Sequence, residues 1–134
     1  MRRFLVFALP LLVLTMALFQ FVLEMAGIDP DPARLSPVSP VNLPGWVTLG
    51  TWCLEALGLT ALFLLIQGGG RTWSSGLMAG WIAWVFRGPL LVVSVVALGG
   101  LPAGPWWSLV LSWWVLYTIC GLLLGGLAAA ARLS

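Results

Sequence analysis

The sequence has no histidine and no lysine, and only 7% of its 134 residues are charged. A soluble domain carries about 25% charged residues, so this composition excludes a water-soluble globule. The absence of histidine removes the most common metal ligand, the most common general base and the usual axial ligand of haem. We therefore expect a membrane protein that is not an enzyme and has no metal and no cofactor of its own.

The sequence also lacks the features of a nucleic-acid-binding protein and of a zinc or redox site. The formal net charge is +2 and the arginines form no long cluster, so we expect no nucleic-acid partner. Cys53 and Cys120 lie in apolar runs and match no zinc or redox spacing, and we expect both thiols to be free and buried. Membrane lipids and other membrane proteins remain as the expected partners.

Apolar residues make up 61% of the chain. A hydrocarbon core of about 30 Å needs about 20 apolar residues in a helix, and four runs reach that length: 4–26, 46–67, 73–98 and 106–130. The runs lack the alternation of barrel strands, and helices satisfy their own backbone hydrogen bonds in lipid. The sequence therefore predicts an all-α integral membrane four-helix bundle that forms a single domain over residues 1–134.

The segments between the runs differ in composition. Residues 27–45 contain five prolines and two aspartates, and we expect this outer loop to run extended across one membrane face. The glycine-containing turns at 68–71 and 99–105 are short, so the second, third and fourth helices are predicted to be antiparallel neighbours. The bundle is then expected to run up, down, up and down.

The positions of the arginines predict the orientation. Most arginines lie on the side of the two chain termini, namely Arg2, Arg3, Arg71 and Arg132. Because arginine favours the cytoplasmic side, we expect both termini in the cytoplasm and the chain in a bacterial inner membrane. Tryptophan favours the membrane interfaces, and the expected interface anchors are Trp46, Trp73, Trp106 and Trp107.

Two charges fall inside the runs, and charge within a membrane span is by default paired or functional. Glu55 and Arg87 lie on successive helices, about 13 Å and about 16 Å from the same boundary at the rise of an α-helix. We predict a buried ion pair between them, with Glu24 as the second choice of partner for Arg87. Pro89 follows Arg87 closely, so we also expect a kink there.

The predicted pair has three interpretations. It fixes the register of the second and third helices; or Glu55 is a proton or cation site with Arg87 as its partner; or Arg87 holds a cofactor, a lipid or a group from another chain. The sequence alone leaves these interpretations open.

Small residues recur at helical spacing and indicate close helix packing in a membrane. The residues expected to pack helices are Gly76, Gly80, Gly121 and Gly125. We expect the third helix to use its glycine strip to bring Arg87 against the second helix, where Gly50 and Gly58 form a comparable strip.

The function expected from these features is a non-catalytic accessory or structural subunit of a larger membrane protein complex, of the respiratory or photosynthetic type. Such a subunit packs against partner helices and against lipid, pigment or cofactor. The alternative is a small transporter or channel formed by several copies of the chain, in which Glu55 and Arg87 line the path.

Overall fold

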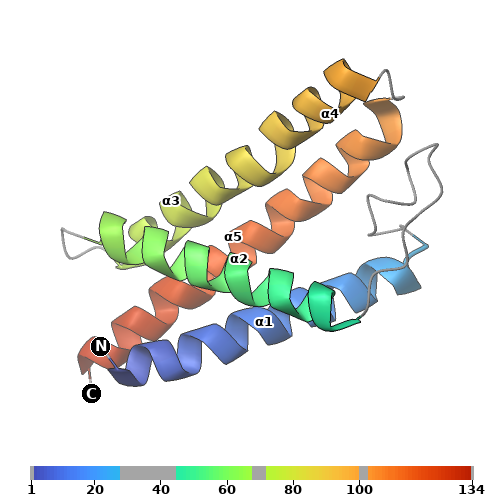
Figure 1. Ribbon diagram of the computed structural model, residues 1–134. Coiled ribbons are helices and arrows are strands. Elements are labelled where there is room, and N and C mark those ends of the chain that lie inside the picture. Colours follow the sequence, from blue (N-terminus) through green and yellow to red (C-terminus); the bar gives the residue numbers. More distant parts are fainter. Residues whose placement is uncertain (1, 28–44, 68–71, 100–102, 134) are drawn as a thin grey trace.

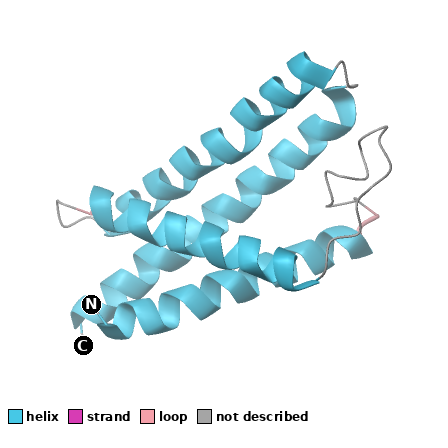
Figure 2. Ribbon diagram, viewed as in Figure 1, coloured by secondary structure: helices cyan, strands magenta, loops and turns pink. Residues whose placement is uncertain are grey.

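The computed structural model describes residues 2–27, 45–67, 72–99 and 103–133. Every element in these ranges is a helix, as Figure 2 shows. The elements are α1 (Arg2–Met25), α2 (Gly45–Ile66), α3 (Thr72–Val85), the π-helical turn η2 (Phe86–Leu90), α4 (Leu91–Gly99) and α5 (Ala103–Leu133). The prediction of an all-α fold is confirmed.

Four stretches of these helices are long and apolar enough to cross a membrane, as predicted. They are Arg3–Met25, Gly45–Ile66, Thr72–Ser94 and Trp106–Ala131. The third predicted helix consists of α3, η2 and α4 in succession, and we call this unit the third span. The outer loop with its prolines, apart from its two end residues, and the turn at 68–71 fall outside the described residues. Of the predicted turn at 99–105, only residues 100–102 fall outside, because Gly99 ends α4 and residues 103–105 belong to the start of α5.

The helices run up, down, up and down (Figure 1). The start of α1, the end of α2, the start of α3 and the end of α5 lie together, and we call this the terminal end of the bundle. The opposite, or far, end holds the end of α1, the start of α2, the end of α4 and the start of α5. Among the described helices, α5 packs against α1 and the third span, and α2 packs against α1 and α3.

All four spans contribute to one core, which extends from the terminal end to mid-bundle. Side chains of α1 enter it at intervals of four residues, because such positions share one face of a helix. They are Phe4, Ala8, Leu12 and Met16. The ring of Phe4 lies 5.9 Å from that of Phe63 on α2, centroid to centroid. Towards the far end, Val92, Trp106 and Val110 form a second and smaller cluster between α4 and α5, and Trp84 of α3 packs against it.

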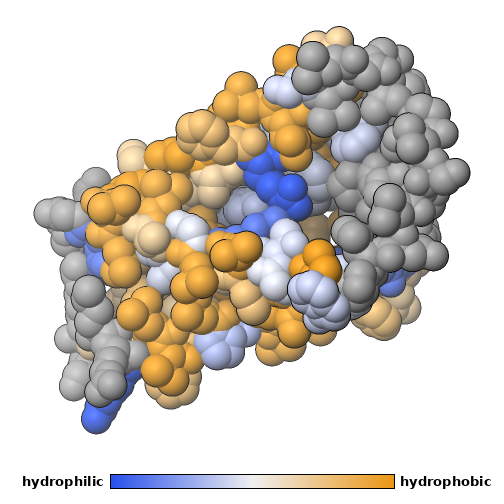
Figure 3. All heavy atoms as spheres, in the orientation of Figure 1, coloured by the Kyte–Doolittle hydropathy of each residue, from blue (hydrophilic) through white to orange (hydrophobic). Residues whose placement is uncertain are grey.

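The outer surface of the bundle is apolar, the reverse of a soluble protein. Large side chains such as Leu65 (83% exposed) and Leu54 (71% exposed) point outward, and Figure 3 shows hydrophobic side chains over most of one face. Lipid is the solvent that fits such a surface. Cys120 is free and buried as expected, whereas Cys53 is free and exposed, which corrects the prediction that both thiols are buried.

The third span changes its helical geometry at Pro89. Proline has no N–H to donate and crowds the preceding turn, and the chain responds with the π-helical turn η2 before α-helix resumes in α4. A π-helical turn of this kind inside a helix is often found at a functional site. Here it contains Arg87.

Candidate functional site

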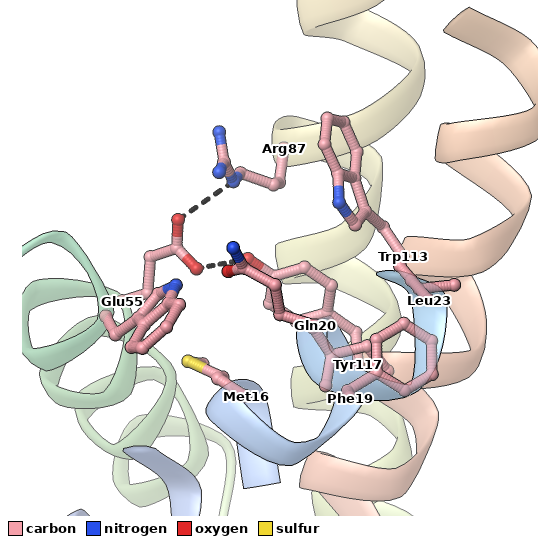
Figure 4. Close-up of a pocket in the computed structure, with 10 residues that line it drawn as sticks. Met16, Phe19, Gln20, Leu23, Glu55, Arg87, Trp113 and Tyr117 are labelled. Carbon is pink, nitrogen blue, oxygen red and sulfur yellow. Dashed lines mark hydrogen bonds and ion pairs between the residues drawn. The ribbon is translucent and has the colours of Figure 1, made fainter. Parts of the chain in front are cut away.

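The structure brings Glu55 and Arg87 together. Glu55 lies near the middle of α2 and Arg87 lies in η2, and Arg87 Nε is 2.9 Å from Glu55 Oε1 (Figure 4). The other carboxylate oxygen, Oε2, accepts a hydrogen bond from the hydroxyl of Tyr117 on α5 at 3.4 Å. The two oxygens of the carboxylate therefore have different partners on two other spans.

Two residues of α5, Trp113 and Tyr117, complete the surroundings of the ion pair. The guanidinium carbon of Arg87 lies 5.0 Å from the centroid of the Trp113 ring, which is within the range of a cation–π contact. Trp113 and Tyr117 are four residues apart on α5 and so share one face of that helix. Tyr117 is the single tyrosine of the chain and lies four residues after an intramembrane tryptophan. This spacing could have indicated from the sequence that Tyr117 belongs to the site.

The ion pair is only partly covered. The side chain of Arg87 is 36% exposed and that of Glu55 is 19% exposed. In Figure 3 a hydrophilic patch interrupts the apolar surface near the middle of the visible face. The charges therefore reach the side of the bundle at the depth where lipid would present its hydrocarbon chains.

A pocket of about 80 Å³ adjoins the ion pair. Its walls come from α1, α2, η2 and α5, and Figure 4 shows the residues that form them. They are Met16, Phe19, Gln20, Leu23, Trp52, Glu55, Arg87, Trp113, Leu116 and Tyr117. The pocket is polar at the ion pair and at Gln20, and its other lining residues are aromatic or aliphatic.

The arrangement of the helices explains why space remains beside the pair. Among the described helices, α2 packs against α3 but not against α4. The two diverge towards the far end in Figure 1. The ion pair of Glu55 and Arg87 connects α2 to the third span at the level of the π-helical turn. The charged pair therefore lies where the third span and α2 begin to part.

The glycines of the third and fourth predicted helices face each other. A Cβ atom at Gly121 would collide with the carbonyl oxygen of Gly76, and one at Gly80 would collide with that of Tyr117. A Cβ at Gly125 would lie 2.8 Å from the carbonyl oxygen of Thr72. The backbones of α3 and α5 thus approach at a distance that only glycine permits.

The expected partner of this glycine strip was wrong. The strip on α3 packs against α5 rather than against α2, and nothing lies within 4 Å of a Cβ placed at Gly50 or Gly58 on α2. The expectation assumed α-helical spacing from Gly76 through Arg87. The π-helical turn, whose hydrogen bonds join residues five apart, interrupts that spacing immediately before Arg87.

The predicted interface tryptophans divide into two groups. Trp46, Trp73 and Trp107 are 74%, 55% and 43% exposed and lie near the ends of their helices. Trp106 is only 5% exposed. Its ring packs against Val92 of α4, so its expected role as an interface anchor is corrected to one in packing α4 onto α5.

Glu24 is not the partner of Arg87. It is exposed at the end of α1, where Gln20 Nε2 donates to its Oε1 at 3.5 Å. The loop residues near it lie outside the described ranges. Within those ranges, no three histidine, cysteine or acidic side chains are placed to hold a metal ion.

The fold and the site define the class of this chain. Its four apolar spans make it a multi-pass membrane protein with an intramembrane ion pair beside a small pocket. Comparison with protein-family models, with curated proteins and with solved structures gives no match to the chain.

Proposed function

We propose that the chain is a non-catalytic accessory subunit of a larger membrane protein complex, of the respiratory or photosynthetic type. One observation carries the proposal: Glu55 and Arg87 reach the side of the bundle, 19% and 36% exposed, in the middle of apolar spans. Charged groups in contact with lipid chains are costly, and in membrane proteins they face protein or a polar cavity. Another molecule of the complex therefore completes the site.

The surface of α2 offers room for a partner helix. Gly50 and Gly58 are exposed, and a Cβ at either position would have nothing within 4 Å. Small residues on an outward face allow a second helix to approach closely in a membrane. Because α3 and α5 already use their own glycines against each other, the glycines of α2 are those available for a contact with another chain.

The proposal includes the orientation and the membrane. The distribution of the arginines supports cytoplasmic termini, and we assign the chain to a bacterial inner membrane. Labelling of single cysteines at the two ends of the bundle in intact cells tests this orientation. A membrane-impermeant thiol reagent is expected to label the far end and to leave the terminal end unlabelled.

A second candidate function is a small transporter or channel formed by several copies. The pocket beside Glu55 favours it, because a path for solutes requires space next to the charge. The packed core towards the terminal end opposes it, since Leu12 and Phe63 are almost completely buried there. Flux into liposomes that falls in Glu55→Gln would favour transport over the accessory function.

The accessory function is tested by purification from the membranes of the native cell in a mild detergent. We expect the tagged chain to migrate with a partner at fixed stoichiometry, and Gly58→Leu to weaken this association by filling the outward face of α2. Leu14→Trp is the matched control, since it adds bulk to an exposed position on α1. A wild-type chain that migrates without any stoichiometric partner would contradict the proposal.

A further inference from the structure

Several polar groups of the pocket are hydrogen-bond donors, and Gln20 adds an amide that both donates and accepts. Both oxygens of Glu55 already accept, from Arg87 and from Tyr117. Arg87 uses Nε for the ion pair, and in Figure 4 one terminal guanidinium nitrogen points away from Glu55. No described residue accepts a hydrogen bond from the indole N–H of Trp52, which also lines the pocket. A molecule that fits this chemistry presents an acceptor oxygen.

The charge of the site favours an uncharged occupant. Glu55 neutralises Arg87 at 2.9 Å, so the pair has no net charge to attract an anion or a cation. An ion carried to this depth would lose its hydration without gaining a counter-charge. Neutral acceptors such as carbonyl oxygens avoid that cost and still receive a strong hydrogen bond from a charged donor.

The depth of the site excludes a phospholipid headgroup. Glu55 lies ten residues after Gly45, the first residue of α2, or about 15 Å along the helix axis. That distance is about half of the hydrocarbon thickness, so phosphate groups at the membrane surface do not reach the pair. The depth of the pocket therefore favours a molecule that dissolves in the hydrocarbon region.

The walls favour a flat ring. Trp52, Phe19, Trp113 and Tyr117 present aromatic surface to the pocket, and aromatic side chains pack well against other rings. The volume of about 80 Å³ is smaller than the cavity of about 150 Å³ that encloses benzene in an engineered protein. A pocket of this size has room for one edge of a ring rather than for a whole ring.

We propose that this pocket binds the carbonyl edge of an uncharged, lipid-soluble ring compound, either a quinone or a pigment with a ring ketone. The carbonyl oxygen accepts from Arg87 and Trp52, and the compound enters sideways from the bilayer where α2 and α4 part. The inference deepens the proposed accessory function, because it names the molecule that completes the site. It adds no chemical step on the ligand.

Binding is tested with the purified full chain in phosphatidylcholine nanodiscs. The probe is a benzoquinone with a ten-carbon tail, titrated while the quenching of tryptophan fluorescence is followed. We expect saturable quenching by the wild type, and no competition from an alkylbenzene that has the same tail and no carbonyl. A second titration with a ring-ketone pigment, followed by visible absorption, distinguishes the two sources of the carbonyl.

Variants locate the site. Glu55→Gln combined with Arg87→Gln keeps the pocket neutral and removes the charged donor, and we expect binding to weaken roughly tenfold or more. Trp52→Phe keeps the ring and removes the N–H, and we expect binding to weaken several-fold. Trp81→Phe is the matched control and is expected to bind as the wild type does, because Trp81 lies outside the pocket and bonds Thr118. If the double variant loses helix content, Trp52→Phe carries the test.

The outcomes separate this inference from the proposed function. Quenching that does not saturate, or that is equal in the wild type and both pocket variants, would overturn the carbonyl site. If such a chain still migrates with a stoichiometric partner, the accessory function stands and a side chain of that partner fills the pocket. Saturable binding by a chain that has no partner would instead contradict the accessory function alone.

Discussion

The third span has two unlike sides. On the side of α5, facing glycines let the two backbones meet directly, so that Gly76 and Gly121 are in contact. On the side of α2, the long side chains of Glu55 and Arg87 meet across a wider separation and leave a pocket beside them. One helix is thus fixed by close packing on one side and keeps space for another molecule on the other.

The contacts of the third span change at the π-helical turn. Before it, α3 contacts both α2 and α5; after it, α4 contacts only α5 among the other spans described. Trp84 strengthens the connection to α5, since its Nε1 donates to the carbonyl oxygen of Val110 at 2.9 Å. The third span is thus attached to α5 along its length, whereas α2 leaves it near Arg87.

The largest expected effect is on the glycine side. Gly121→Leu places a side chain against the backbone of α3, which cannot move without separating the helices, and we expect a loss of about 3 kcal/mol or more in the free energy of unfolding. Gly58→Ala is the matched control, because nothing lies near its added Cβ, and it is expected to stabilise by up to about 1 kcal/mol. Unfolding in mixed detergent micelles measures both. Equal effects would refute the distinction between the two sides.

Breaking the ion pair is expected to have the next largest effect. Glu55→Gln leaves Arg87 with an uncompensated charge, and we expect a loss of about 2 kcal/mol. This is less than the roughly 3–5 kcal/mol of a fully buried pair, because the side chain of Arg87 is 36% exposed. Adding Arg87→Gln is expected to restore most of the lost stability. A double variant less stable than the single one would contradict this account.

Loss of the indole hydrogen bond to α5 is expected to have a smaller effect. Trp84→Phe removes the donor to the Val110 carbonyl, which we expect to lower the free energy of unfolding by about 1 kcal/mol. Trp81→Phe provides the comparison, because its bond to the Thr118 hydroxyl is longer, at 3.2 Å, and exposed. The same unfolding assay applies. An equal or larger loss in Trp81→Phe would argue against Trp84 as an attachment of the third span.

The smallest expected effect comes from Tyr117. Tyr117→Phe removes a hydrogen bond of 3.4 Å to Glu55, and hydrogen bonds between membrane helices contribute about 0.6 kcal/mol on average. We expect a loss of about that size. A loss as large as that of Glu55→Gln would mean that Tyr117, rather than Arg87, is the principal partner of the carboxylate.

The sequence predicted the features that depend only on the length of an apolar run and on the position of a residue along its helix. Four apolar runs indicate four spans, and the positions of Glu55 and Arg87 along two antiparallel helices place them at one level. The rotation of each helix about its axis depends on packing against neighbours, which one sequence does not specify. For that reason, only the fold shows that Tyr117 lies on the side of α5 that faces Glu55 and that Trp106 is buried.

The sequence also did not specify which neighbouring helix the glycine strip of α3 faces. Its members were predicted from their spacing, but the projection to Arg87 required an uninterrupted α-helix. Pro89 indicated a disturbance without specifying its form. A kink and a π-helical turn rotate the following residues differently, so the side of the third span that carries Arg87 was decided by local backbone geometry.

We propose that another molecule completes the open side of the third span. Native mass spectrometry of the chain, purified from its own membranes in mild detergent, tests it most directly. We predict that the wild type retains an additional subunit or ligand, that Glu55→Gln combined with Arg87→Gln loses a bound mass, and that Leu14→Trp keeps it. A wild-type chain observed only at its own mass, identical to the double variant, would contradict the account.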